Sequence, residues 1–120
     1  MKSHRDLNVW QNSIQLVTEI YTLTKDFPKD ELFGLTNQLR SALVSIPSNI
    51  AEGAARNHEK EFIQFLYISL GSCAEIETQM IISKNLEFID SQTLEVFLGK
   101  VANIRNMLIG LIKAVKSSNK

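Results

Sequence analysis

The sequence predicts an all-α protein, an up-down-up-down antiparallel four-helix bundle that forms a single domain over residues 1–120. Three observations predict it. Apolar residues recur at helical spacing in four long segments, and only short connections separate these segments, as between antiparallel neighbours. No stretch rich in Gly or Ser divides the chain. Helices of roughly 20 to 28 residues would be about 30 to 42 Å long, at about 1.5 Å per residue.

The first helix is expected to begin after Asp6, whose side chain can cap it. Two apolar stripes run side by side along this segment. The first contains Leu7, Trp10, Ile14, Val17 and Tyr21, and the second contains Val9, Leu16, Ile20 and Leu23. Residues 26–30 are expected to end the helix, because Pro28 disfavours the helical conformation at Phe27 and Asp30 offers the next cap.

The second helix is expected from about Glu31 to about Ala55. Its core stripe consists of Leu32, Leu35, Leu39, Leu43, Ile46 and Ile50. Pro47 falls inside this helix, where proline removes a backbone donor and crowds the preceding turn, at about 3 kcal/mol. The sequence therefore predicts either a kink near Pro47, over residues 43–47, or two abutting helices, and the unbroken apolar stripe favours the kink.

Two further helices follow. Asn57 is expected to cap the third, and Asp90 or Ser91 the fourth. The third helix repeats at Phe62, Leu66, Ser69, Cys73, Ile76 and Met80. The fourth carries the most regular stripe, at Leu94, Phe97, Val101, Ile104, Leu108, Leu111 and Val115.

A second pattern on the second helix is not explained by its core stripe. Small and polar residues follow one another in steps of three and four, which places them along one line of the helix. The line consists of Gly34, Gln38, Ser41, Ser45, Ser48, Glu52 and Ala55. The candidate oligomer interface takes Gly34, Gln38, Ser41, Ser45, Ser48 and Glu52 from it and adds Asn49, whose amide can satisfy buried polar contacts. This line is either a solvated face or a surface for self-association. The two stripes on the first helix favour self-association, since an isolated bundle needs only one buried face per helix.

The sequence contains no arrangement of residues that supports catalysis. Neither His4 nor His58 has a Glu three residues before it, as a di-iron bundle requires. Cys73 lies on an apolar stripe, which favours a small buried side chain over a nucleophile. No Gly-rich phosphate loop is present. We therefore expect no catalytic residue, cofactor or metal. With no secretory signal or transmembrane span, we expect a cytoplasmic protein without membrane contact.

Charge is balanced overall but not along the chain. Thirteen basic and thirteen acidic residues give a net charge of zero, which argues against strong nonspecific nucleic-acid binding by a monomer. Residues 61–90 hold five acids and one cation, and residues 91–120 hold five cations and one acid. Some of these charges are expected to pair between the two helices. The alternative is a basic surface for phosphate, formed by Arg105, Lys113, Lys116 and Lys120.

Four sequence runs carry a family resemblance. They are DLNVWQ at 6–11, FGLTNQLR at 33–40, SIPSNIAEG at 45–53 and GSCAEIETQ at 71–79. Together they resemble the 23S rRNA intervening-sequence proteins, bacterial four-helix bundles first found as reading frames inside large-subunit ribosomal RNA genes. The resemblance implies a second helix that tolerates Pro47 and a ring-like homopentamer, which would give the small-residue line a partner.

A related branch comprises the accessory proteins of diversity-generating retroelements, which bind nucleic acid through a strongly basic surface. This chain departs from that pattern because its charge is balanced. The first hypothesis is a non-enzymatic, self-assembling structural or adaptor protein near ribosomal RNA or another ribonucleoprotein. The alternative is a weak RNA- or DNA-binding accessory protein that uses its basic last helix, whose lysines a pentamer would bring together.

Overall fold

The computed structural model describes residues 3–118 and contains four α-helices. They are α1 (Asn8–Thr24), α2 (Leu35–Ala55), α3 (Glu59–Asn85) and α4 (Ser91–Ser117), with short 3₁₀-helices η1 (His4–Asp6) and η2 (Lys29–Glu31) before α1 and α2. The described part of the chain holds no strand. The prediction of an all-α four-helix bundle is confirmed.

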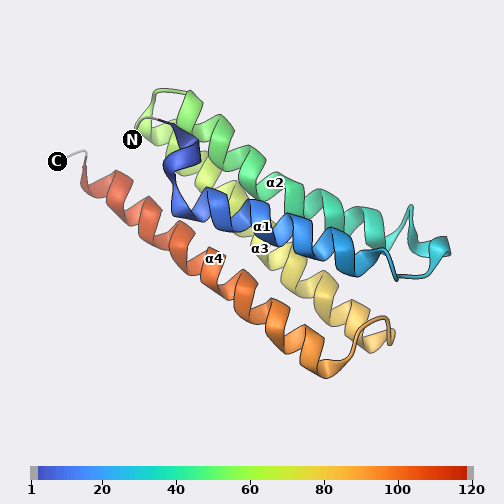
Figure 1. The fold of residues 1–120 in the computed structure, drawn as a ribbon. Coiled ribbons are helices and arrows are strands. Elements are labelled where there is room, and N and C mark those ends of the chain that lie inside the picture. Colours follow the sequence, from blue (N-terminus) through green and yellow to red (C-terminus); the bar gives the residue numbers. More distant parts are fainter. Residues whose placement is uncertain (1–2, 119–120) are drawn as a thin grey trace.

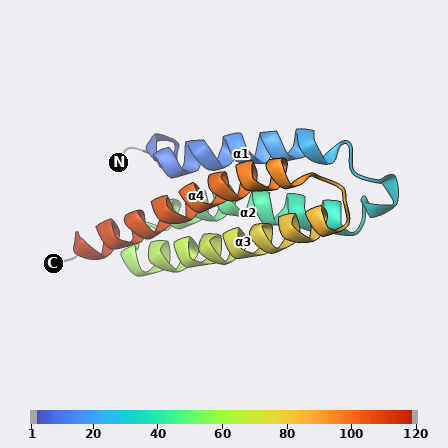
Figure 2. The same ribbon diagram turned by 90° about the horizontal axis from the view of Figure 1, so that it is seen from below.

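The helices lie side by side in an elongated body of 49 × 24 × 19 Å. Each helix returns along the one before it, so both ends of the chain lie at the same end of the body (Figures 1 and 2). The contact between α2 and α3 is the most extensive, and the contact between α1 and α4 is the smallest of those between neighbouring helices. The bundle is therefore most open between its first and last helices.

The two stripes on α1 are buried to different extents, since Leu7, Trp10 and Val17 of the first stripe pack against the core but are only half-buried. Val9, Leu16 and Ile20 are buried against the other helices. Ile14 and Tyr21, from the other stripe, are 41% and 37% exposed. The first helix therefore presents an apolar stripe to the outside, which an isolated bundle does not need.

The starts of α1 and α2 differ from the sequence prediction. Asp6 does not cap α1, because its carboxylate accepts from the backbone N–H of Ser3 in a capping box around η1. Leu7 is the residue before α1 and makes no side-chain cap. The second helix begins at Leu35, because the chain first forms η2, and Leu32 therefore lies outside the core at 47% exposure.

The predicted cap of α4 is confirmed, and the predicted cap of α3 is wrong. Asn57 adopts a left-handed conformation at φ 56° and precedes the N-cap residue, His58, so the prediction that Asn57 caps α3 is wrong. Asp90 caps α4 as predicted, with its carboxylate accepting from the backbone N–H of Thr93 at 2.7 Å. The same hydrogen bond lowers the pKa of Asp90.

Pro47 lies inside α2 without interrupting it. The helix runs continuously from Leu35 to Ala55, so the alternative of two abutting helices is wrong. Pro47 is itself buried. A kink at this point stays a prediction.

Candidate self-association surface and basic helix end

An apolar groove of about 470 Å³ lies on the outside of the bundle between α1 and α2. Its lining residues are Trp10, Ile14, Val17, Val44, Pro47 and Ala51, with His4, Thr18 and Ser48 at its edges. The less buried stripe of α1 supplies one wall, and the flank of α2 supplies the other. Val44 is 40% exposed here, much like Ile14 opposite it. A second apolar surface packed against this groove would remove Ile14 and Val44 from water.

Charge is almost absent from this part of the molecule. Residues 8–24 and 35–51 contain only two charged side chains, Glu19 and Arg40. Glu19 pairs with Lys100 of α4 at 2.5 Å, on the other side of α1. Arg40 donates to the hydroxyl of Thr24 at 2.9 Å. Depletion of charge is typical of the buried centre of protein interfaces, so this α1–α2 face has the composition of one.

Of the predicted interface residues, only Ser48 lines the groove, and the set does not all face outward. Gln38, Ser41, Ser48 and Glu52 are exposed, while Gly34 is half-buried as the residue before α2. Glu52 forms an ion pair with Arg56 at 2.9 Å. The other two members of the set, Ser45 and Asn49, are half-buried.

Ser45 and Asn49 are used inside the chain. The hydroxyl of Ser45 lies 2.5 Å from that of Ser72 on α3, and the side-chain amide of Asn49 donates to the carbonyl of Ser45 at 2.7 Å. Part of the small-residue line therefore serves the packing of α2 on α3. The pattern alone could not separate Ser45 from the exposed members of the line, because its spacing is the same as theirs.

The predicted basic residues are spread along α4. Arg105 pairs with Glu77 of α3 at 3.9 Å, one of the pairings expected between the acidic and basic helices. The ammonium group of Lys116 donates to the hydroxyl of Tyr67 at 3.2 Å. Lys113 is exposed. Lys120 lies outside the described residues. Arg105 is more than two turns from Lys113, so within one chain the four do not form a single cluster.

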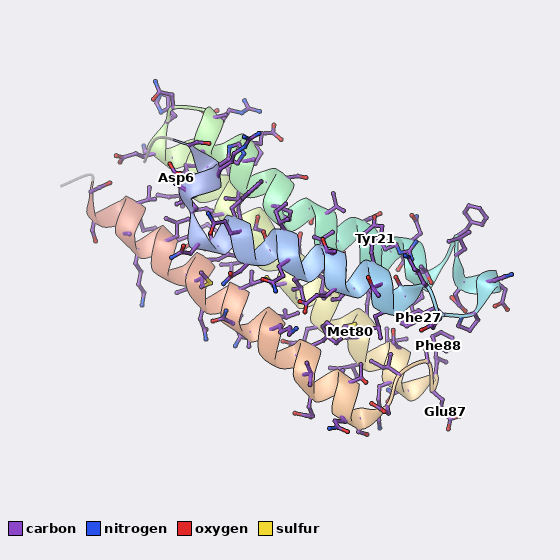
Figure 3. All side chains as sticks on the ribbon, in the orientation of Figure 1. Asp6, Tyr21, Phe27, Met80, Glu87 and Phe88 are labelled. Atoms are coloured by element: carbon purple, nitrogen blue, oxygen red, sulfur yellow. The ribbon has the colours of Figure 1, made fainter. Side chains whose placement is uncertain are left out.

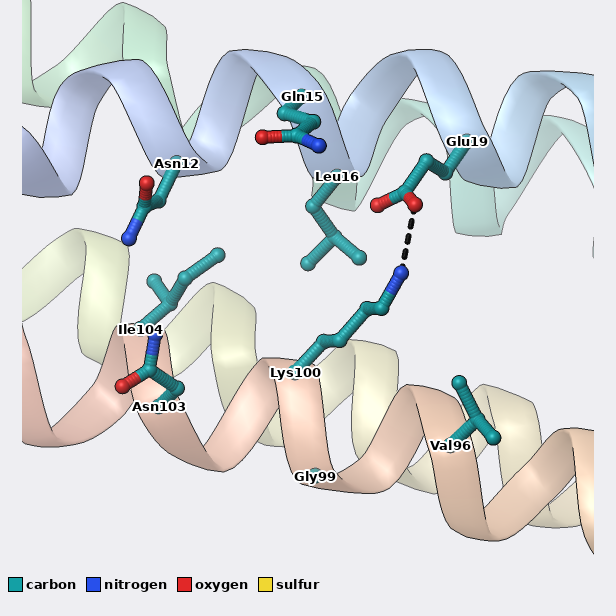
Figure 4. Close-up of a pocket in the computed structure, with 9 residues that line it drawn as sticks. All are labelled: Asn12, Gln15, Leu16, Glu19, Val96, Gly99, Lys100, Asn103 and Ile104. Carbon is teal, nitrogen blue, oxygen red and sulfur yellow. Dashed lines mark hydrogen bonds and ion pairs between the residues drawn. The ribbon is translucent and has the colours of Figure 1, made fainter.

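A second groove, of about 370 Å³, lies where α1 and α4 separate, and no sequence pattern predicted it. Leu16 and Ile104 form its floor, and the ion pair of Glu19 with Lys100 crosses it (Figure 4). Amide side chains line the rest, contributed by Asn12, Gln15 and Asn103. The groove is polar, unlike the α1–α2 face.

Comparison with known proteins places the chain in a family. The family model described as 23S rRNA-intervening sequence protein matches residues 5–110. The chain belongs to the 23S rRNA-intervening sequence protein family. The resemblance found in the sequence is thereby confirmed. No curated protein matches the chain in sequence.

A solved structure supports the same assignment. This 23S rRNA-intervening sequence protein is similar to a crystal structure from Bacteroides thetaiotaomicron, described as a protein of unknown function from the S23 ribosomal protein family. The two are 25% identical and superpose with a TM-score of 0.81, over 88% of this chain and 98% of the other. The shared fold therefore covers nearly all of both proteins.

The chemistry available to this family member within residues 3–118 is limited. Cys73 is buried. Burial raises the pKa of its thiol to about 11, although the positive charge of Arg105 acts in the opposite direction and lowers this pKa. A thiol with so high a pKa is a poor nucleophile at neutral pH. The described residues include no group of three or more His, Cys, Asp or Glu side chains that could hold a metal ion. None of their helices is long and apolar enough to cross a membrane.

Proposed function

We propose that this 23S rRNA-intervening sequence protein is a non-enzymatic bundle that assembles with copies of itself and acts as a structural or adaptor protein. The observation that carries the proposal is the apolar, nearly uncharged α1–α2 face. Half-exposed Ile14 and Val44 would leave water on association, and removal of apolar area from water is the main driving force for it.

A ring of five copies is the assembly that the family resemblance implies, and we adopt it in the proposal. A ring needs a heterologous contact, in which the α1–α2 face of one copy meets a different surface of the next. The outside of α3 offers such a surface, since it exposes Ile68, Ile81 and Ile82. The family description supports a place near ribosomal RNA or another ribonucleoprotein in the cytoplasm.

Analytical ultracentrifugation at micromolar concentration tests self-assembly. The wild-type chain should sediment as an oligomer, and Val44→Asp should sediment as a monomer because it places a charge in the apolar groove. Val96→Asp is the matched control, since Val96 is a valine of similar exposure, 50%, that lies on α4 at the polar α1–α4 groove, away from the α1–α2 face. Circular dichroism verifies that both variants are folded.

The outcomes separate the parts of the proposal. A wild-type chain that sediments as a monomer would contradict self-assembly itself. An oligomer that both substitutions disrupt equally, or that neither disrupts, would retain self-assembly but remove the α1–α2 face as its interface.

A second candidate function is weak binding of nucleic acid by the C-terminal part of α4. The observation in its favour is that Lys113 and Lys116 are exposed and, among residues 3–118, pair with no carboxylate. Such binding would weaken steeply with salt. The double substitution Lys113→Glu and Lys116→Glu should abolish a low-salt mobility shift of RNA. Absence of any shift by the wild-type protein at low ionic strength would remove this candidate.

A further inference from the structure

A small cavity of about 160 Å³ lies at the end of the bundle where α1 stops and α2 starts. The connection between the two helices, which includes η2, forms its outer wall. Its lining residues are Thr24, Lys25, Phe27, Pro28, Lys29, Leu32, Thr36 and Arg40. Phe27 packs on Phe88 of the α3–α4 connection, with ring centroids 5.4 Å apart, and so fixes this wall to the rest of the bundle (Figure 3).

The charged residues that line the cavity are all positive. Lys25, Lys29 and Arg40 come from the end of α1, from η2 and from α2, and no acid is among the lining residues. Over residues 3–118, none of the three forms an ion pair with a carboxylate. Glu31 accepts from the backbone N–H of Leu35 at 3.2 Å, so its carboxylate lies at the start of α2. Asp26 and Asp30 follow Lys25 and Lys29 in the chain, but neither is among the residues that line the cavity. Three cations that line one cavity without an ion pair favour an anion there.

Arg40 is held in place before any ligand arrives. Its Nε donates to the hydroxyl of Thr24 at 2.9 Å, and one terminal nitrogen donates to the carbonyl of Tyr21 at 3.4 Å. Its guanidinium also lies over the ring of Tyr21, at 4.6 Å from the centroid. Figure 3 shows Tyr21 near Phe27, at the end of α1 beside the cavity. Since a guanidinium has five N–H donors, three remain for a ligand.

Thr36 provides an independent sign of a missing partner. It lines the cavity as the second residue of α2 and is only 2% exposed. Among residues 3–118 its hydroxyl has no hydrogen-bond partner, although buried hydroxyl groups almost always have one.

We propose that this cavity binds a small tetrahedral oxyanion, either free phosphate or the terminal phosphate of a monoester. Arg40 and the hydroxyl of Thr36 would donate hydrogen bonds to the oxygen atoms, and Lys25 and Lys29 would neutralise the charge. The small volume and the apolar side chains of Phe27 and Leu32 suit one phosphate group rather than a continuous polynucleotide backbone. The site is separate from the α1–α2 groove and does not depend on self-assembly.

Calorimetric titration of the full chain with inorganic phosphate, at constant ionic strength and pH 7.5, tests the site directly. One phosphate should bind per chain. Lys29→Gln should weaken binding about threefold, as expected for loss of one exposed charge. Lys60→Gln is the matched control, since it removes another exposed cation, from the first turn of α3, and should leave the affinity unchanged. A parallel titration with phenyl phosphate distinguishes the two ligands. If the natural ligand is a monoester, phenyl phosphate should bind more tightly than inorganic phosphate. If it is free phosphate, inorganic phosphate should bind more tightly than phenyl phosphate.

Thr36→Val gives a readout that a purely structural role would not produce. Without phosphate, this isosteric change should raise the melting temperature, because it removes a buried hydroxyl that has no partner. With phosphate, the variant should show a smaller rise in melting temperature than the wild type and about fivefold weaker binding.

Two results would overturn the site. One is a wild-type chain that shows no more response to phosphate than to chloride at equal ionic strength. The other is equal weakening by Lys29→Gln and Lys60→Gln, which would mean general screening of surface charge. A Thr36→Val variant that binds phosphate as tightly as the wild type would remove Thr36 from the site.

Discussion

The hydroxyl oxygens of Ser45 on α2 and Ser72 on α3 lie 2.5 Å apart, within hydrogen-bonding distance across the most extensive helix contact of the bundle. A neighbouring contact has the same character, since the hydroxyl of Ser69 donates to the carbonyl of Ile46 at 3.1 Å. Small polar side chains thus allow α2 and α3 to approach closely while their buried hydroxyl groups stay hydrogen-bonded.

Gly53 lies at the closest part of this contact. A Cβ atom at this position would lie 2.7 Å from the Cβ of Phe65. We therefore expect Gly53→Ala to destabilise the protein by about 1 to 3 kcal/mol through overpacking, even though alanine is the better helix former by about 1 kcal/mol. Urea unfolding followed by circular dichroism measures the change.

Gly110→Ala provides the control for Gly53→Ala. A Cβ at Gly110, in α4, meets nothing within 4 Å, so this variant should gain up to about 1 kcal/mol from helix propensity alone. Equal effects of the two substitutions would mean that the close approach at Gly53 is not a determinant of stability.

Trp10 should report association of the α1–α2 face. It is the only tryptophan of the chain and lines the groove in a half-buried position. If a second copy covers the groove, its emission should shift to shorter wavelength as concentration rises, and Val44→Asp should remove the shift. An emission maximum that stays constant from nanomolar to high micromolar concentration would argue against burial of this face.

Asp90 should make stability depend on pH in the acid range. The backbone N–H of Thr93 donates to its carboxylate and lowers its pKa below the ordinary value of 3.8. A group with a lowered pKa in the folded state stabilises the protein above its unfolded pKa, and this contribution is lost as pH falls through the folded pKa. Asp90→Ala should therefore lower the urea midpoint at pH 7, and the difference from wild type should shrink below about pH 4.

The control for Asp90 is Glu95→Ala, which removes an exposed acid from α4 that is not its N-cap residue. Its effect on the midpoint should be smaller at pH 7. A constant difference between wild type and Asp90→Ala across the acid range would contradict the role of the charged cap.

Cys73 should be inert in the native protein. Burial raises the pKa of its thiol to about 11, so only about one thiol in a thousand is ionised at pH 8. Iodoacetamide should therefore alkylate the folded chain far more slowly than the chain in guanidinium chloride, as mass spectrometry can follow. Equal alkylation rates in the folded and the unfolded chain would mean that α3 opens readily around Cys73.

The sequence predicted some helix boundaries correctly and others not, as individual residues show. The helical spacing of apolar residues located α3 and α4 well, and Asp90 was recognisable as a cap because it directly precedes a regular stripe. The start of α2 was predicted four residues early, because Asp30 and Glu31 have the composition of a helix start but form part of η2. Local preferences of these residues allow both an α- and a 3₁₀-turn, so the choice depends on packing.

The candidate surfaces were predictable only in part. The first helix carries two apolar stripes in its sequence, and nothing in their spacing says that Leu16 belongs inside and Ile14 outside. The small-residue line on α2 has the same limit, since Ser45 turns toward α3 while Ser41 stays exposed. Both distinctions depend on which neighbouring helix each side of α1 and α2 meets.

By itself, the sequence determined the all-α class, the approximate extents of the helices and the family, because helical periodicity and local motifs are properties of contiguous residues. Tertiary structure alone decided which stripe of α1 is buried, how α2 fits against α3 and which side chains line the cavity between Lys25 and Arg40. These features join residues that are distant along the chain, and their proximity follows from the packing of whole helices.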